Sequence, residues 1–192
     1  MAGADPTLGA ARLLGGLAFS LGLVLVVIAG AELFTGNNLI VMAWADRLVG
    51  TGALLRNWLL VYIGNAIGAA GMLVLTWGAN PFGLAGGGYG STALAITNAK
   101  LALPPFQAFC SGVLCNVLVC LAVWMCFSCR QVVGKIFCIA FPITAFVALG
   151  FEHSIANMYL FPDVMLASGE AGSDALHGFL GILIPVTLGN IL

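Results

Sequence analysis

Long apolar segments separated by short polar connections dominate this chain. Segments of membrane-spanning length lie at residues 13–45, 58–77, 106–127, 136–161 and 175–192. The first and fourth of these are interrupted by polar residues, and the last reaches the end of the chain. About 20 consecutive apolar residues make one helical crossing of a bilayer. The pattern therefore predicts an all-α membrane protein in which two of the helices are broken.

A polar motif occurs once in each half of the chain. The pattern G-x-E-x-x-x-x-N lies at residues 30–37 and again at residues 150–157. A carboxylate and an amide at membrane depth are costly, so they usually face a cavity or a pathway. We expect the backbone to break at residues 34–38 and 152–157, because irregular backbone is tolerated there when it lines a cavity or is buried in protein. Each break would expose the N-terminus of a half-helix, which favours an anion.

A second sequence signal follows each motif. Gly64-Asn65 comes after the first copy and Gly189-Asn190 after the second. The two copies fall on spans expected to run in opposite directions, which is typical of an inverted-topology repeat. We therefore expect a single transmembrane domain over residues 1–192, with a first repeat at roughly 1–78 and a second at roughly 100–192.

The distribution of basic residues predicts the orientation in the membrane. The connections 46–57 and 128–135 carry two basic residues each, whereas 78–100 and 162–177 hold only Lys100 between them. By the positive-inside rule the first pair is cytoplasmic and the second pair external. Residue 1 would then lie outside, which leads us to expect a further span before it. The Gly-rich part of 78–100 is expected to form a flexible external loop.

Composition supports the membrane class and limits the chemistry. Hydrophobic residues make up 61% of the chain and charged residues 7%, whereas a soluble domain carries roughly a quarter charged residues. The net charge of −1 gives no reason to expect a nucleic-acid partner. Among the six cysteines, Cys126 and Cys129 form one C-x-x-C without a second pair or a nearby His. We therefore expect packing cysteines, no metal, no cofactor and no catalytic residue.

Several residues in the spans are candidates for a pathway. His153 is the histidine inside a span and lies beside Glu152 in the second motif, which favours a functional role. The hydroxyl of Thr35 could donate to a passing anion. Glu32 and Glu152 are expected to anchor the broken backbone by accepting from N–H groups. Apolar residues that could form gates or simply core are Phe19, Leu23, Leu33, Phe34, Val119 and Phe146.

Four stretches resemble the signatures of the formate/nitrite transporter family, namely residues 32–37, 115–125, 150–158 and 184–190. The resemblance covers nearly the whole chain and follows the family's order. It implies an aquaporin-like inverted-repeat helical bundle with six spans, two of them broken. It also implies a homopentamer in the inner membrane that passes small monovalent anions, formate or nitrite, and is not an enzyme. Relative to that plan, we expect this chain to lack the first span and most of the sixth.

The resemblance also implies roles for individual residues. His153 matches the central pore histidine, Thr35 the threonine of the loop in the family's second span, and Lys100 the outer-vestibule lysine that attracts anions. Asn116 and Asn157 match polar residues near the pore. The cytoplasmic constriction matches Leu23, Leu33, Phe34 and Val119, and the outer one matches Phe19 and Phe146.

We expect an anion to approach past Lys100, shed water at an apolar constriction and meet Thr35 and His153. If His153 gives it a proton, a neutral acid crosses the apolar region and avoids the cost of burying a bare ion. The alternatives are a hydrosulfide, lactate or other short-monocarboxylate channel of the same family, or a water or neutral-solute channel. From another class, a membrane anchor subunit of a redox enzyme would hold haem through His153 and His177.

Overall fold

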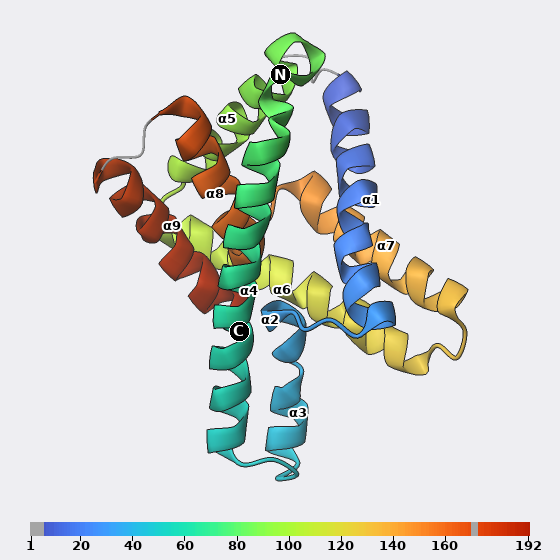
Figure 1. Cartoon of the computed structure of the whole chain (residues 1–192). Coiled ribbons are helices and arrows are strands. Elements are labelled where there is room, and N and C mark those ends of the chain that lie inside the picture. The colour runs from blue at the N-terminus through green and yellow to red at the C-terminus, as the bar shows by residue number, and fades with distance from the viewer. Residues whose placement is uncertain (1–5, 170–172) are drawn as a thin grey trace. The chain divides into compact units, whose positions relative to one another are not determined.

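The structure is a computed structural model that describes residues 6–169 and 173–192, and these fold almost entirely into helices (Figure 1). The helices are α1 (Pro6–Ala29), α2 (Phe34–Asn37), α3 (Ile40–Ala45), α4 (Thr51–Ala79), the 3₁₀ helix η1 (Pro81–Gly87), α5 (Gly88–Leu101), α6 (Pro105–Ser128), α7 (Val132–Leu149), α8 (Ser154–Ser168) and α9 (Ser173–Ile191).

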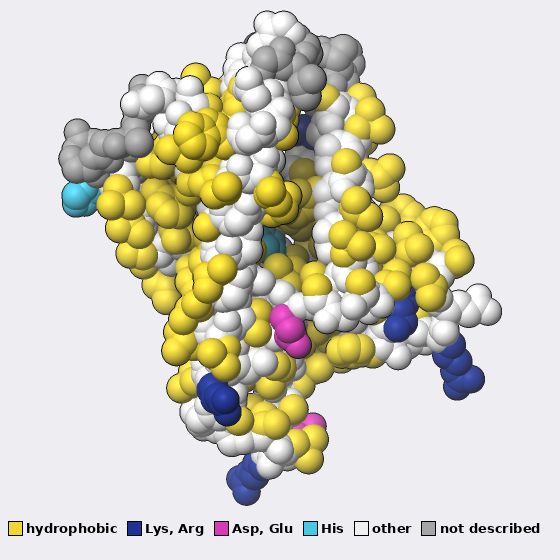
Figure 2. Space-filling model, viewed as in Figure 1, with side chains coloured by type: hydrophobic (Ala, Val, Ile, Leu, Met, Phe, Trp, Pro, Cys, Tyr) yellow, Lys and Arg dark blue, Asp and Glu magenta, His cyan; other side chains and the backbone are white. Residues whose placement is uncertain are grey.

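Within the described residues, four helical segments are long and apolar enough to cross a membrane. They are Gly9–Ala29, Thr51–Ala79, Pro105–Ser128 and Val132–Leu149, and Leu176–Ile191 adds a shorter apolar helix. Figure 2 shows apolar side chains over most of the visible face, and many of the large ones are exposed. An exposed apolar surface of this extent is what lipid tails cover, so the all-α membrane class expected from hydropathy is confirmed.

The chain divides into two compact units. The first contains Met1–Val61, Leu114–Phe151 and residue 191, and the second contains Tyr62–Val113, Glu152–Asn190 and residue 192. Helices α4 and α6 therefore each contribute residues to both units. The division into repeats at 1–78 and 100–192 stays a prediction.

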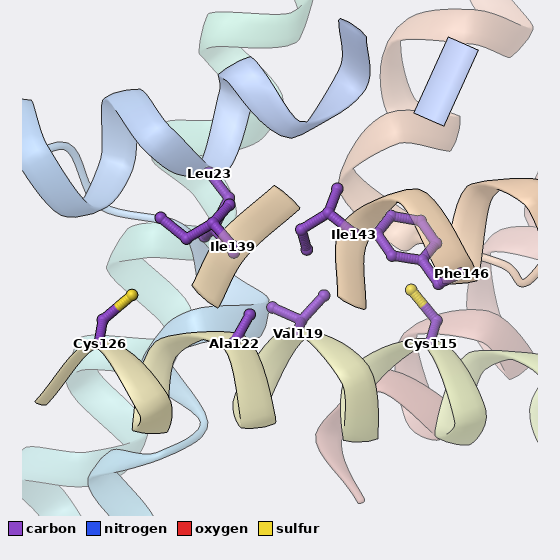
Figure 3. Close-up of a cluster of buried hydrophobic side chains, with 8 residues drawn as sticks. All are labelled: Leu23, Cys115, Val119, Ala122, Cys126, Ile139, Ile143 and Phe146. Atoms are coloured by element: carbon purple, nitrogen blue, oxygen red, sulfur yellow. The ribbon is translucent and has the colours of Figure 1, made fainter. Parts of the chain in front are cut away.

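The core of the first unit lies between α1, α6 and α7. Members on α6 and on α7 recur three or four positions apart, so each helix presents one face to the cluster. The buried members, drawn in Figure 3, are Leu23, Cys115, Val119, Ala122, Cys126, Ile139, Ile143 and Phe146. Helix α1 packs along α7, and a Cβ placed on Gly16 would lie 2.8 Å from the Cα of Thr144. The missing side chain of Gly16 thus permits a close approach of the two helices.

Both interrupted spans contain a backbone break, as expected, but the breaks do not lie at the predicted residues. Gly30 has φ of +78° and Gly150 has φ of +74°, and glycine adopts this left-handed conformation at helix ends without a Cβ penalty. The irregular residues are therefore 30–33 and 150–153, and a further turn at residues 38–39 separates α2 from α3. Residues 34–37 form α2 and residues 154–157 open α8, so both copies of the motif return to helix earlier than predicted.

The Gly-rich connection is the main element that the sequence did not predict. Instead of a flexible loop, the residues after α4 form η1 and then the 14-residue helix α5. Helix α5 packs on α8 within the second unit, and it buries Ala93 and Thr97. Helix α5 contains only two glycines, Gly88 and Gly90, both in its first turn, so most of its length carries no glycine penalty.

Candidate functional site

The second copy of the motif forms a buried polar cluster in the second unit. Lys100 Nζ, near the end of α5, lies 2.8 Å from both carboxylate oxygens of Glu152. Asn157 on α8 donates its side-chain amide to Glu152 Oε2 at 2.8 Å. The Glu152 side chain is 2% exposed and that of Lys100 is 19% exposed. The pair is thus largely desolvated, and opposite charges in contact with an added hydrogen bond offset part of that cost.

The broken backbone around Glu152 is held by two further side chains. The Glu152 N–H donates to Ser111 Oγ at 3.0 Å, and the Ser154 N–H donates to Asn190 Oδ1 at 2.8 Å. The amide of Asn190 also donates to the carbonyl oxygens of Gly112 and Glu152, at 2.8 and 3.1 Å. These bonds satisfy backbone groups that a helix break would otherwise leave unpaired. Asn190 therefore ties α9, α6 and the break together.

These contacts correct one expectation about Glu152. We expected its carboxylate to accept from backbone N–H groups, but it accepts from the side chains of Lys100 and Asn157. The backbone is instead satisfied by Ser111 and Asn190. Lys100 is correspondingly ion-paired, and its role at an outer vestibule stays a prediction.

His153 is the N-cap of α8. Its backbone is extended, with φ of −122° and ψ of 115°, and its Nδ1 accepts from the N–H of Ala156 at 3.2 Å. An imidazole that accepts at Nδ1 carries its proton at Nε2 when it is neutral. The ring is 6% exposed. The fold therefore sets the tautomer and makes Nε2–H of His153 a hydrogen-bond donor beside the positive end of the α8 dipole.

The first copy of the motif lies in the first unit and repeats the Glu–Asn contact. The side-chain amide of Asn37 donates to Glu32 Oε2 and, at 2.9 Å, to Asn57 Oδ1. The indole N–H of Trp58 donates to the Asn37 carbonyl at 3.1 Å. Glu32 is exposed, unlike Glu152. Thr35 beside them is fully buried on α2, and its carbonyl oxygen is 3.7 Å from Cys120 Sγ.

The apolar candidates also lie in the first unit. Leu23, Val119 and Phe146 belong to its core cluster, and Leu33 packs against it. Figure 3 shows Leu23 toward the Cys126 end of the cluster and Phe146 toward the Cys115 end. The remaining two candidates lie outside the buried cluster. Phe34 is 3% exposed, and Phe19 is half-exposed with its ring edge-on to Phe146 at a centroid distance of 5.7 Å.

Several buried side-chain oxygens have no hydrogen-bond partner among the described residues. They are Asn116 Oδ1 in the first unit, and Thr97 Oγ1, Ser154 Oγ, Asn157 Oδ1 and Asp163 Oδ2 in the second. Buried polar atoms are rarely left unpaired, and those that are need an explanation such as water or a passing solute. Asn116 and Asn157 are the two asparagines expected near a pore, while Thr97, Ser154 and Asp163 were missed by the sequence analysis.

Ser111 and Asn190 were also missed as site residues. The repeated Gly-Asn signal pointed to Asn190 without giving its role. Ser111 carries no sequence signal, because its contact with Glu152 arises only when α6 packs beside the break.

Comparison with known proteins identifies the relatives of this chain. The sequence profile described as formate/nitrite transporter matches residues 1–192. Formate channel FocA of Escherichia coli (strain K12) is 42% identical over 96% of this chain and 70% of its own length. Formate channel FocA of Haemophilus influenzae is 39% identical over the same shares. The probable formate transporter of Methanothermobacter thermautotrophicus is 39% identical over the whole of this chain and 74% of its own.

Solved structures agree with the sequence comparison. A pentameric formate channel with formate bound superposes with a TM-score of 0.83 at 40% identity, covering 97% of this chain and 80% of the other. An FNT family ion channel superposes with a TM-score of 0.79 at 35% identity, covering 98% and 74%. The aquaporin-like fold with two broken helices is thereby confirmed. This is a multi-pass membrane transport protein and not an enzyme, and the chain belongs to the formate/nitrite transporter family.

Proposed function

We propose that this protein is a channel for small monovalent anions, with formate as its main substrate and nitrite as a second one. The observation that carries the proposal is the hydrogen-bonding state of His153, whose Nδ1 caps α8 and whose Nε2–H is therefore a donor. A carboxylate or nitrite oxygen accepts hydrogen bonds and donates none, so a fixed N–H donor suits it. The names of its relatives, formate channels at about 40% identity, support the same substrate.

The charge balance around His153 suits weak and reversible binding. Lys100 and Glu152 neutralise one another, and a neutral His153 adds no charge. An anion at this place therefore meets a hydrogen-bond donor and the N-terminus of the 15-residue α8, and not an unpaired cation. Conduction requires binding that is favourable enough for entry and weak enough for release.

A proton relay through His153 needs one further step. If the ring passes its Nε2 proton to the anion, Nδ1 must take up a proton to keep the imidazole neutral. Nδ1 then becomes a donor and cannot accept from the N–H of Ala156. Proton transfer is thus coupled to the opening of a helix cap worth about 1 kcal/mol. We propose hydrogen-bond donation as the basic step, with proton transfer as a coupled event.

We further propose that Thr35 supplies a hydroxyl to the path, with Asn116 and Asn157 as nearby polar groups and Lys100 as a charged element bound to Glu152. Apolar constrictions keep water and larger ions out, because a narrow apolar section excludes solutes that retain their hydration shell. The proposed constriction residues are Leu23, Leu33, Phe34 and Val119 on one side, and Phe19 and Phe146 on the other.

We propose that the protein works as a homopentamer in the lipid bilayer of the inner membrane. A solved relative at 40% identity is described as pentameric, which supports this assembly. We also propose that the connections 46–57 and 128–135 face the cytoplasm, because their basic residues follow the positive-inside rule.

The test is solute flux through the protein reconstituted in liposomes. Uptake of formate and nitrite, compared with lactate, hydrosulfide and water, identifies the substrate. Saturable formate uptake that falls steeply in His153→Phe supports the proposal, whereas water flux without anion flux would overturn it. An unchanged pH dependence of uptake in His153→Phe would remove the proton relay but leave the channel function standing.

A further inference from the structure

Two cysteines that the transport function does not use lie in contact. Cys129 follows the last residue of α6, and Cys138 lies in the second turn of α7. Their Sγ atoms are 3.4 Å apart, and both thiols are free and partly accessible. A disulfide has an S–S length of about 2.05 Å, so the two sulfur atoms need to approach by only about 1.4 Å.

The structure also shows why the pairing is Cys129 with Cys138 and not the C-x-x-C pair. Cys126 is buried on α6 and directs its thiol toward the carbonyl oxygen of Lys135, at 3.7 Å. Cys129 lies beyond the helix end, where its N–H bonds the Cys126 carbonyl at 3.2 Å. Gly134 lies against Cys129, since a Cβ added to it would be 3.4 Å from Cys129 Sγ. The α6–α7 turn thus brings Cys129 to α7.

The surroundings favour a negatively charged reaction partner. Arg130 is adjacent to Cys129 and exposed, and Lys135 is half-buried on the first turn of α7. Positive charge around a reactive group raises the local concentration of anionic reagents. Glutathione disulfide is such a reagent. Within residues 6–169 and 173–192, no group of three or more His, Cys, Asp or Glu side chains could hold a metal ion, so oxidation fits this pair better than metal binding.

We propose that Cys129 and Cys138 form a redox-modifiable dithiol that small-molecule disulfides oxidise to an intrachain disulfide. The Cys129 thiolate attacks one sulfur of the reagent, whose S–S bond breaks and releases one thiol. The Cys138 thiolate then attacks Cys129 Sγ and releases the second thiol. Two protein thiols are oxidised, one reagent disulfide is reduced, and the two protons end on the two released thiols.

The bridge would tie the end of α6 to α7 next to the core cluster of the first unit. Cys126 belongs to that cluster and Cys138 packs against it. If the connection 128–135 is cytoplasmic, which rests on the proposed orientation, the bridge lies in a reducing compartment. Disulfides there are usually transient and redox-sensing. The chemistry of the pair itself does not depend on the transport function.

The test treats the purified whole chain with glutathione disulfide, followed by alkylation and peptide mass spectrometry. We expect two peptides joined by a disulfide between Cys129 and Cys138, with a combined mass lower by two hydrogen atoms. Dithiothreitol should separate them completely. In Cys138→Ser the reaction should stop at a mixed disulfide between Cys129 and glutathione. Cys110→Ser is the matched control, because Cys110 is also half-buried but lies on the other half of α6, and it should react as the unchanged protein does.

Two results would overturn the proposal. One is equal alkylation of Cys129 and Cys138 before and after oxidation, while the protein remains folded by circular dichroism. The other is a product that joins different cysteines or different chains. The disulfide should form in Cys126→Ser at a rate within about twofold of that in the unchanged protein, because Cys126 takes no part in the exchange. That result supports the assigned pair.

Discussion

Lys100 Nζ contacts both carboxylate oxygens of Glu152 at 2.8 Å, and this ion pair distinguishes the two copies of the polar motif. In both copies the asparagine donates to the glutamate five residues before it. The exposed Glu32 shares its asparagine with Asn57, whereas the buried Glu152 has Lys100. The Glu–Asn bond is thus the shared structural element, and the cation belongs to the copy that carries the histidine.

Removing the charge of Glu152 should destabilise the protein strongly. Glu152→Gln leaves the ammonium of Lys100 without its counter-charge in a largely buried place, and breaking a buried pair in this way costs about 3 kcal/mol. Thermal unfolding in detergent, followed by circular dichroism, measures the loss. Glu32→Gln is the matched control, since Glu32 is exposed and should cost less than about 1 kcal/mol.

The double variant Lys100→Met/Glu152→Gln tests the cause of that loss. Because it removes both charges together, it should recover most of the stability lost in Glu152→Gln. A double variant that is no more stable than Glu152→Gln alone would show that the ion pair is not the reason.

The cap of α8 predicts different effects for two substitutions of His153. His153→Asn keeps a side-chain acceptor at the N-cap, where asparagine is strongly favoured, so stability should hold. His153→Phe removes the acceptor for the Ala156 N–H and should lose about 1 kcal/mol. Thermal unfolding separates the two. Formate flux through His153→Asn then reports on the loss of the imidazole alone. If His153→Asn lost as much stability as His153→Phe, the capping role would be contradicted.

Asn190 should hold the irregular backbone next to His153 in place. Asn190→Ala leaves the Ser154 N–H and the carbonyl oxygens of Gly112 and Glu152 without their partner. Three lost bonds at about 1 kcal/mol each predict a loss of about 3 kcal/mol. Hydrogen exchange at the Ser154 amide should accelerate. The exposed Asn98 is the control, and equal exchange at Ser154 in Asn190→Ala and Asn98→Ala would exclude this role.

Hydropathy alone was enough to predict the membrane class, because lipid exposure demands long apolar helices whatever their packing. The two breaks were also predictable from polar groups at membrane depth. Their exact extent was not, because it depends on which glycine adopts the left-handed conformation. Gly30 and Gly150 do so, and the motif's first residue is therefore a helix terminator.

Contacts between distant residues could not be predicted. Lys100 and Glu152 are 52 positions apart, and their pairing depends on α5, which the glycines of its segment concealed. Repetition in sequence was also an incomplete guide. A Cβ on Gly189 would collide with the carbonyl oxygen of Phe109, whereas a Cβ on Gly64 meets nothing within 4 Å among the described residues. The matching glycines thus have different surroundings.

Two adjacent glycines on α1 give a final prediction about packing in the first unit. A Cβ on Gly16 would lie 2.8 Å from both Cα and the carbonyl oxygen of Thr144 on α7, while a Cβ on Gly15 meets nothing within 4 Å among the described residues. Gly16→Ala should therefore force α1 from α7 and cost about 1–3 kcal/mol. Gly15→Ala should be neutral or stabilise by up to about 1 kcal/mol, because alanine favours helix. Thermal unfolding of both variants in the same detergent decides the matter, and similar stabilities would mean that α1 and α7 do not pack at Gly16.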